Sequence, residues 1–273
     1  MQTQWQIAHA SVIGNGHTRE GLPCQDAHAV WQENSNFIAV VCDGAGSCAH
    51  SDRGARWVAD FVLEQLQSLL HHEDDFTMMD ESGWNDFVHQ LLRNVQAGLS
   101  EYAVAESIGY KDLSCTLISI IAAGDKLYSF HVGDGRGGYQ LEDGSWHAFM
   151  TPYHGEEANE TVFVTSSIWD SPETYIETSI VDAKITAVCL MTDGCEQASF
   201  QCNLYDEDQA IFYDPNLPHP PFFDPNVAAL VSFHEAQKPQ EEVNALWATF
   251  LQDGNQKLRF ETDDKTLVLG VRV

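Results

Sequence analysis

The sequence predicts an α+β protein, in which buried strands pair in hairpins and amphipathic helices lie apart from them. Two unbroken apolar runs, at 37–44 and at 185–194, each end in the dipeptide Asp-Gly. Runs of this length predict strands that are buried on both faces. Between 84 and 102, apolar residues recur every three or four positions, which predicts a helix with one wide apolar face. Strands and helices that are segregated along the chain are typical of the α+β class.

Length and charge limit the range of functions. With 273 residues, of which 44% are hydrophobic, the chain can bury an ordinary core. It contains no repeat and no linker, so we expect one domain over residues 1–273. The 41 acidic and 13 basic residues give a formal net charge of -28. Such a charge repels nucleic acids and anionic membranes, so we expect neither as a partner, whereas metal ions and basic protein segments are favoured.

Cysteine usage and the N-terminus indicate a cellular compartment. The seven cysteines form no C-x-x-C pair, and several lie within apolar runs, as expected for free thiols in a reducing compartment. The first residues carry no signal-peptide pattern, and nowhere do 18 apolar residues follow one another. We therefore expect a cytoplasmic protein.

The N-terminal half predicts strands first and helices second. A strand at 5–13, a loop at 14–23 rich in turn residues, and a hairpin of strands at 27–31 and 37–42 come first. Helical spacing then predicts helices at 54–69 and 84–102.

The C-terminal half returns to strands. We expect a hairpin of strands at 114–121 and 127–132, short strands and loops over 139–183, and a buried strand from 185. Residues 200–226 hold five of the nine prolines and many aromatic residues, which predicts a long, ordered covering loop. A final helix at 243–250 and a final buried strand at 266–271 follow.

Five aspartates stand at the ends of these strands, namely Asp26, Asp43, Asp134, Asp193 and Asp263. If the strand ends converge, the carboxylates repel one another and raise one another's pKa unless cations neutralise them. Oxygen ligands of this kind suit Mg²⁺ or Mn²⁺. A pair of such ions can activate water for attack on phosphorus.

Other interpretations of these motifs have less support. Asp-Gly is also a common turn dipeptide, and the copies at 143–144 and 253–254 indicate a hairpin turn and a helix end. Residues 44–49 match the dinucleotide pattern G-x-G-x-x-A, but Asp43 would repel a pyrophosphate there. The twelve histidines are scattered, which disfavours a zinc site.

The order of the motifs resembles the metal-dependent protein phosphatase 2C family, in particular its bacterial branch with Asp-Gly-Ala-Gly-Ser. The resemblance rests on Gln-Asp-Ala at 25–27, Val-Cys-Asp-Gly-Ala-Gly at 41–46, Ser-Cys-Thr at 114–116, Val-Gly-Asp-Gly-Arg at 132–136, Thr-Asp-Gly at 192–194 and Asp-Asp-Lys-Thr-Leu-Val at 263–268. It implies a four-layer α-β-β-α sandwich of two mainly antiparallel sheets flanked by helix pairs. It also implies hydrolysis of phosphoserine and phosphothreonine by a metal-activated water.

The resemblance implies a centre of two Mn²⁺ or Mg²⁺ ions with these ligands. Asp43 would bridge both ions, and the carbonyl of Gly44 would join the second. Asp193 and Asp263 would hold the first ion. Asp26 would support the second ion directly or through water.

Further site residues follow from the same resemblance. Asp134 with Asp193 would form a weaker third metal site. The arginine that grips phosphate in the family is displaced here, which leaves Arg19 for this role. Ala45 stands where eukaryotic members have a histidine, so the proton for the leaving group must come from a metal-bound water, which we favour, or from His50, the closest histidine in sequence.

The function expected from this reasoning is that of a bacterial-type serine/threonine phosphatase. Its partners would be a phosphorylated protein substrate and a cognate Ser/Thr kinase, and we expect a monomer. The alternative is a pseudophosphatase that binds phosphoproteins or acts as a scaffold. The retained aspartates favour the enzyme, because an acidic cluster without ions would be costly to maintain.

Overall fold

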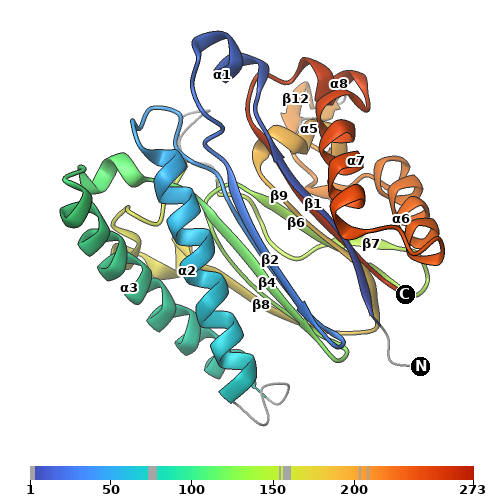
Figure 1. Cartoon of the computed structure of the whole chain (residues 1–273), viewed down its shortest axis with the longest axis horizontal. Coiled ribbons are helices and arrows are strands. Elements are labelled where there is room, and N and C mark those ends of the chain that lie inside the picture. The colour runs from blue at the N-terminus through green and yellow to red at the C-terminus, as the bar shows by residue number, and fades with distance from the viewer. Residues whose placement is uncertain (1–3, 73–78, 154, 156–160, 203, 208) are drawn as a thin grey trace.

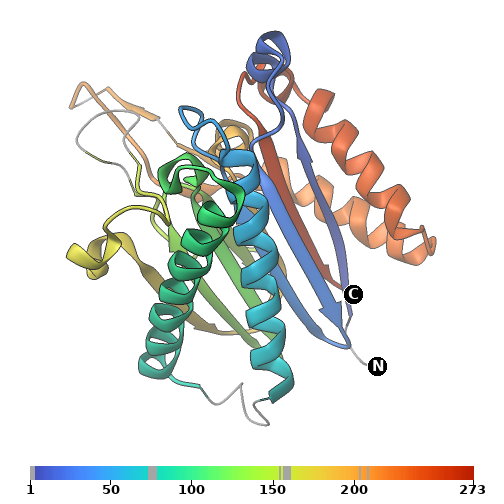
Figure 2. The same ribbon diagram turned by 60° about the vertical axis from the view of Figure 1, so that its left-hand side comes forward.

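The computed structural model describes residues 4–72, 79–153, 155, 161–202, 204–207 and 209–273. Two five-stranded antiparallel sheets face each other, and helices cover their outer faces (Figures 1 and 2). This arrangement confirms the four-layer sandwich that the sequence predicts.

The first layer pair is the β2 sheet with two long helices. Its strands, in spatial order, are β2 (Ala27–Glu33), β3 (Asn36–Cys42), β4 (Leu117–Ala123), β5 (Lys126–Val132) and β8 (Glu177–Asp182). Helices α2 (Ser51–His72) and α3 (Glu81–Glu106) lie on its outer face (Figure 1). Alternation along β3 explains the two-sided burial, because Val40 packs toward these helices and Val41 packs toward the other sheet.

The second layer pair is the β1 sheet with the C-terminal helices. Its order is β1 (Trp5–Val12), β14 (Lys265–Arg272), β9 (Ile185–Met191), β6 (Arg136–Leu141) and β7 (Trp146–Ala148). Helices α6 (Pro220–Glu235) and α7 (Gln240–Asp253) cover it. The Trp247 indole N–H donates to the carbonyl of Leu267 at 2.9 Å, which fixes α7 on β14. The first and last strands pair along their whole length, so both chain ends belong to one sheet.

Three apolar layers hold the four structural layers together. One lies under α2 and α3, one lies under α6 and α7, and the third lies between the sheets. Phe37 and Ile118 from the β2 sheet meet Val188 and Leu190 from the β1 sheet in this middle layer, and none is more than 1% exposed. Truncating one such side chain costs about 2 to 5 kcal/mol. The strand ends that carry the aspartates therefore stand on a rigid base.

A short helix replaces the predicted loop near the N-terminus. Helix α1 (Asn15–Glu20) starts after Gly14, without a side-chain cap. The N–H of Gly16 donates to the carbonyl of Thr262 at 2.8 Å, and the Thr18 hydroxyl donates to the carbonyl of Gly14 at 2.9 Å. Contact with a distant segment thus supports α1, and local sequence gives no signal for it.

The prediction of one covering loop at 200–226 is wrong. This segment contains the short strands β10 (Phe200–Gln201), β11 (Leu204–Asp206), β12 (Ile211–Tyr213) and β13 (Leu217–Pro218), and then enters α6. Prolines are tolerated in the first turn of a helix, where the missing N–H has no partner to lose. Phe222 and Phe223 of α6 are buried, but the aromatic residues of β11 and β12 are exposed.

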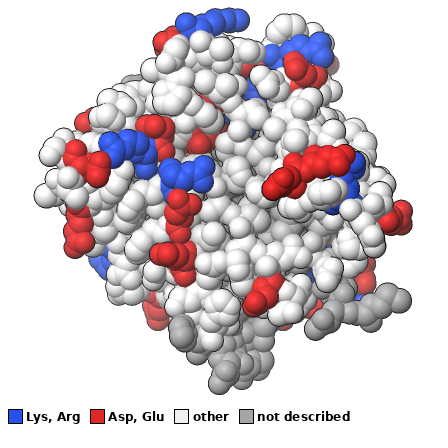
Figure 3. Space-filling view, in the orientation of Figure 1, with Lys and Arg blue, Asp and Glu red and all other residues white. Residues whose placement is uncertain are grey.

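The remaining elements are short. They are η2 (Tyr110–Leu113), η3 (Ile168–Asp170), α4 (Pro172–Tyr175), η4 (Asp193–Cys195), α5 (Glu196–Ser199) and α8 (Gln256–Phe260). No helix in the described ranges combines the length and the hydropathy that a membrane span requires. On the face shown in Figure 3, charged side chains of both signs lie scattered over a mostly uncharged surface, so the excess of acid is not concentrated there.

Candidate active site

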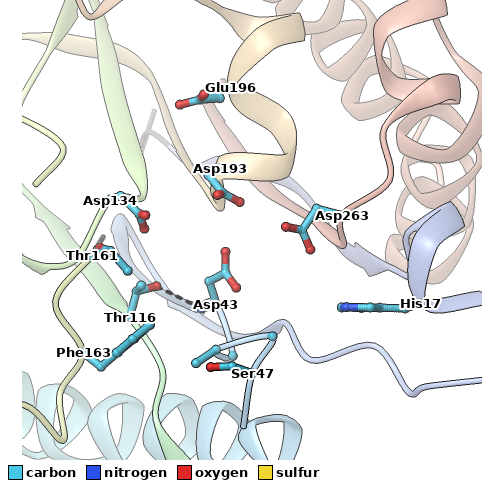
Figure 4. A pocket seen from close by; sticks show the side chains of 13 residues that line it. His17, Asp43, Ser47, Thr116, Asp134, Thr161, Phe163, Asp193, Glu196 and Asp263 are labelled. Atoms are coloured by element: carbon cyan, nitrogen blue, oxygen red, sulfur yellow. Dashed lines mark hydrogen bonds between the residues drawn. The ribbon is translucent and has the colours of Figure 1, made fainter. Parts of the chain in front are cut away.

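A cavity of about 600 Å³ opens at the end of the sandwich where strands of both sheets stop. Asp43, Asp134, Asp193 and Asp263 line it, and Figure 4 shows their carboxylates directed toward its centre from different elements. The structure therefore brings together four of the five aspartates that the sequence singles out.

Asp43 follows β3 and is held by the neighbouring strand. Its backbone N–H donates to the Thr116 hydroxyl at 3.1 Å, and the Thr116 N–H donates to the Asp43 carbonyl at 2.8 Å (Figure 4 shows the first bond). Gly44 comes next, and a Cβ there would lie 2.5 Å from the carbonyl of Gln25. Only glycine fits this approach, so the turn that presents Asp43 has little freedom.

Asp193 and Asp263 come from adjacent strands of the β1 sheet. Asp193 follows β9 and Asp263 precedes β14, and these strands pair in register. A Cβ on Gly194 would lie 1.9 Å from the carbonyl of Asp264, so the two turns pack directly against each other. This contact places the two carboxylates on the same side of the cavity.

Asp134 lies where the chain crosses from one sheet to the other. It sits between β5 of the β2 sheet and β6 of the β1 sheet. Gly133 before it has a φ of 118°, and a Cβ there would lie 2.6 Å from the Thr116 side chain. The crossing needs glycine at this position, and the aspartate after it faces the cavity (Figure 4).

The electrostatics of the cavity favour cations. Burial raises the pKa of the Asp43 carboxyl well above its usual range, and the charges of Asp26 and Asp193 raise it further. Burial, followed by the charges of Asp134 and Asp263, raises the pKa of Asp193 to about 7. Among the described residues, Asp193 Oδ1 is buried without a hydrogen-bond partner. Both features are expected of carboxylates that act as ligands of a metal ion.

The side chains of the cavity supply only part of the oxygen ligands that a hard divalent ion requires. Within the described ranges, no three Asp, Glu, His or Cys side chains meet closely enough to form a complete metal site. Mg²⁺ commonly binds through one or two carboxylates and retains waters, so this spacing suits it. Backbone oxygens such as the carbonyl of Gly44, which lines the cavity, can add to the set.

Asp26 lies behind the cavity and does not line it. The Thr192 hydroxyl donates to Asp26 Oδ2 at 2.8 Å, which joins the start of β2 to the end of β9. Burial raises the pKa of Asp26 well above its usual range. After burial, the charge of Asp26 raises the pKa of Asp43, so Asp26 acts on the cavity through its charge.

Two of the catalytic candidates from the sequence are not brought to the cavity. Arg19 is exposed on α1 and does not line the cavity wall. His50 lies just before α2, where its carbonyl accepts the N–H groups of Arg53 and Gly54, and it does not line the cavity either. Sequence distance to Asp43 was therefore a poor guide, because the chain turns away from the cavity before residue 50.

His17 of α1 lines the cavity, unlike Arg19 and His50. Figure 4 shows its ring directed inward past Asp263. Its Nδ1 lies 2.9 Å from Asp264 Oδ2. The Asp264 carboxylate, 1% exposed, also accepts the N–H of Gln25 at 2.5 Å and that of Gly14 at 2.7 Å. The ring of His17 thus lies against a fixed carboxylate, although its Nδ1 makes no hydrogen bond within the described ranges.

Among the cavity residues that sequence reasoning missed are His17, Thr116 and Glu196. Thr116 belongs to the Ser-Cys-Thr motif, and Glu196 follows Asp193 within one helical turn, so both carried a positional signal. His17 carried none, since it lay in a segment predicted to be a loop.

The sequence profile described as protein phosphatase 2C matches residues 13–248. The chain belongs to the protein phosphatase 2C family. Among curated proteins, it is similar to "Serine/threonine-protein phosphatase 3" of Escherichia coli (strain K12), with 27% identity and 98% coverage of both chains.

Solved structures share the protein phosphatase 2C fold with this chain. A serine/threonine phosphatase from S. agalactiae superposes with a TM-score of 0.59 at 14% identity, covering 98% of this chain and 99% of that one. The catalytic domain of the serine/threonine phosphatase PstP, in complex with two manganese ions, gives a TM-score of 0.53 at 18% identity, with 99% coverage of each. At these identities the likeness concerns the fold.

Proposed function

We propose that this chain is a metal-dependent protein serine/threonine phosphatase that hydrolyses phosphoserine and phosphothreonine. The observation that carries the proposal is the cavity, into which two sheets direct Asp43, Asp134, Asp193 and Asp263. Membership of the protein phosphatase 2C family supports the same reaction. A pseudophosphatase has no observation in its favour, because the acidic cavity is intact.

The proposed ligands are the aspartates that face the cavity. Asp43 would bridge two Mn²⁺ or Mg²⁺ ions, the Gly44 carbonyl would join one of them, and Asp193 and Asp263 would hold the other. The unpartnered Asp193 Oδ1 supports this assignment. Bound divalent ions supply the positive charge that neutralises the carboxylates, attracts the phosphate ester and activates water for attack on phosphorus.

Two of the assigned aspartates have supporting roles in this proposal. Asp26, which donates no atom to the cavity wall, would act on the second ion through water and through its charge on Asp43. Asp134 with Asp193 would form a weaker third site, since both line the cavity and, after burial, the charge of Asp134 raises the pKa of Asp193.

We assign proton transfer to the leaving group to His17, in place of the metal-bound water favoured from the sequence and of its alternative, His50. Nδ1 lies 2.9 Å from Asp264 Oδ2 but has no hydrogen-bond partner among the residues that the structure describes, so this contact places the ring at the cavity without fixing which ring nitrogen carries the proton. A proton on Nε2 can pass to the departing serine oxygen, or the protonated ring can donate to a phosphoryl oxygen. A positioned acid contributes about 10²-fold or more to such a step.

The test of the reaction uses p-nitrophenyl phosphate and phosphopeptides with Mn²⁺, with Mg²⁺ and with EDTA. We expect turnover that requires the ion, and we expect Asp43→Asn to abolish it while the fold is retained. Asp86→Asn, which changes an exposed carboxylate on α3, is the matched control and should keep full activity. Turnover in EDTA, or an active Asp43→Asn variant, would refute the metal mechanism.

The test of His17 compares leaving groups. His17→Gln should lose about tenfold or more on a phosphoserine peptide and much less on p-nitrophenyl phosphate, whose leaving group needs little protonation. His50→Gln is the matched control and should behave like the wild type on both. Equal losses on both substrates for His17→Gln would instead assign a structural role to the residue.

The proposal extends to the cellular compartment, the opposing kinase and the oligomeric state. All seven cysteines are free thiols, which agrees with a cytoplasmic location. The enzyme would oppose a serine/threonine kinase, whose products are its substrates. We propose a monomer, because one chain supplies all residues of the cavity.

A further inference from the structure

The hairpin formed by β11 (Leu204–Asp206) and β12 (Ile211–Tyr213) exposes an unusual amount of apolar surface. Among the described residues, it contributes half of the large hydrophobic side chains that are exposed. These are Leu204 at 37%, Tyr205 at 52%, Ile211 at 49%, Phe212 at 66% and Tyr213 at 46% exposure. The register places Tyr205 and Phe212 on one face of the hairpin and Leu204, Ile211 and Tyr213 on the other. Exposed apolar side chains gathered in this way mark an interaction surface on a folded protein. We call this hairpin the aromatic hairpin.

The aromatic hairpin has internal order of its own. Tyr205 and Phe212 are register partners, and their ring centroids lie 4.9 Å apart. Figure 2 shows the hairpin (light orange) projecting outward from the sandwich beside the ends of the strands. A two-stranded hairpin is marginally stable by itself, so its position needs an anchor.

Arg136 provides that anchor and connects the aromatic hairpin to the catalytic cavity. The Arg136 side chain is 1% exposed. Its Nε donates to Glu196 Oε2 at 2.8 Å, its Nη2 to Asp214 Oδ2 at 2.5 Å and its Nη1 to Asn216 Oδ1 at 2.8 Å. Glu196 lines the cavity, whereas Asp214 directly follows β12. One buried guanidinium therefore fixes the base of the hairpin to the cavity wall.

The charge of the segment indicates what it can bind. From Phe200 to His219 the sequence contains no Lys or Arg, and it carries acidic residues at 206–208 and at 214. The chain as a whole has a net charge of -28. A surface that combines exposed aromatic rings with carboxylates is complementary to a peptide that carries both apolar and basic side chains.

We propose that the aromatic hairpin is a docking site for the phosphoprotein substrate, and that it binds an apolar and basic segment flanking the phosphorylated residue. This inference rests on the proposed phosphatase function and adds a substrate class to it. The phosphate would enter the cavity while the flanking segment lies on Tyr205 and Phe212, which share one face of the hairpin. Selectivity then depends on the residues around the phosphosite, and chemistry depends on the cavity alone.

The test compares two phosphoserine peptides of equal length. One carries Arg, Lys, Leu and Phe around the phosphoserine, and the other carries Ser, Gly and Gln at the same positions. For the wild type, kcat/KM should be at least tenfold higher on the basic, apolar peptide, mainly through a lower KM. Added salt should raise that KM, because exposed charges are screened.

The variant that tests the site is the double substitution Tyr205→Ser and Phe212→Ser. It should lose about tenfold in kcat/KM on the basic, apolar peptide and stay within twofold of the wild type on the neutral peptide and on p-nitrophenyl phosphate. Val104→Ser, at a position 79% exposed on α3, is the control for removing an exposed apolar side chain. It should leave all three substrates unchanged.

Other outcomes would overturn the docking role in distinguishable ways. An equal loss on all three substrates would show that the hairpin only supports the fold. A wild type that sediments as a dimer and a double variant that sediments as a monomer, with unchanged peptide kinetics, would assign the patch to a second copy of this chain. Binding to anionic vesicles with unchanged peptide kinetics would assign it to a membrane. Failure of the proposed function itself would appear differently, as absent turnover of p-nitrophenyl phosphate in the wild type.

Discussion

Replacement of Asp193 by asparagine should stabilise the metal-free protein while it removes activity. In the folded protein the pKa of Asp193 is about 7, compared with an ordinary value of 3.8. Below pH 3.8 the group is protonated in both states and contributes no difference. As the pH rises toward 7, the unfolded chain releases this proton and the folded chain retains it, so stability falls. Above pH 7 the full cost of the buried charge is present.

The size of this effect follows from the two pKa values. The full difference corresponds to about 4 kcal/mol of unfolding free energy. Because Asp193 keeps partial exposure, solvent offsets some of this cost, and we expect roughly 2 to 4 kcal/mol. Asparagine carries no charge and removes this cost of the buried carboxylate. The gain of Asp193→Asn over the wild type should therefore be near zero at pH 4, increase to pH 7 and stay constant above it.

The assay is urea unfolding of protein that has been freed of metal ions, at intervals between pH 4 and pH 8. Asp86→Asn on the surface of α3 should show no such pH-dependent gain. Addition of Mn²⁺ should reverse the order of stability, because the wild type retains the ligand that the variant lacks. A difference between variant and wild type that does not change with pH, or a variant that is less stable at pH 8, would refute the reasoning.

Three further changes test other parts of the structure. Gly194→Ala should lower the free energy of unfolding in urea by about 3 kcal/mol or more, because its Cβ would lie 1.9 Å from the carbonyl of Asp264. Gly46→Ala is the control and should be nearly neutral, because its Cβ would meet nothing closer than 3.9 Å. Arg136→Met should cost about 3 to 5 kcal/mol, because it leaves two carboxylates without their buried partner; a cost below about 1 kcal/mol would show that the anchor is dispensable. The melting temperature of the wild type should rise with Mn²⁺ concentration, and a melting curve that ignores millimolar Mn²⁺ would argue against a metal centre.

The elements that local pattern defines could be predicted from the sequence. The turn at 143–144 joins β6 to β7 with Gly144 at a φ of 84°, and α7 ends at Asp253 before a glycine, as the Asp-Gly dipeptides indicated. The four cavity aspartates were found for the same reason, because each lies within two residues of the end of a buried strand. Strand ends at one edge of a sandwich converge, so their positions in the sequence were sufficient.

The parts that depend on distant contacts could not be predicted. Helix α1 is held by Thr262, and without that contact no signal shows which of its residues faces the cavity. His17 and Arg19 are two positions apart, so they point to different sides of the helix, and the structure selects the histidine. The exposure of β11 and β12 was missed for a related reason. Aromatic residues predicted burial, but only the structure shows that they are anchored by Arg136 and left exposed.

The origin of the cavity aspartates on two different sheets has a mechanical consequence. Asp43 extends from the β2 sheet, whereas Asp193 and Asp263 extend from the β1 sheet. Ions bound between them would crosslink the two sheets. The affinity of the site for these ions would therefore depend on the spacing between the sheets. A substitution in the middle apolar layer, such as Ile118→Ala, would then lower the affinity for Mn²⁺ although Ile118 is not a metal ligand.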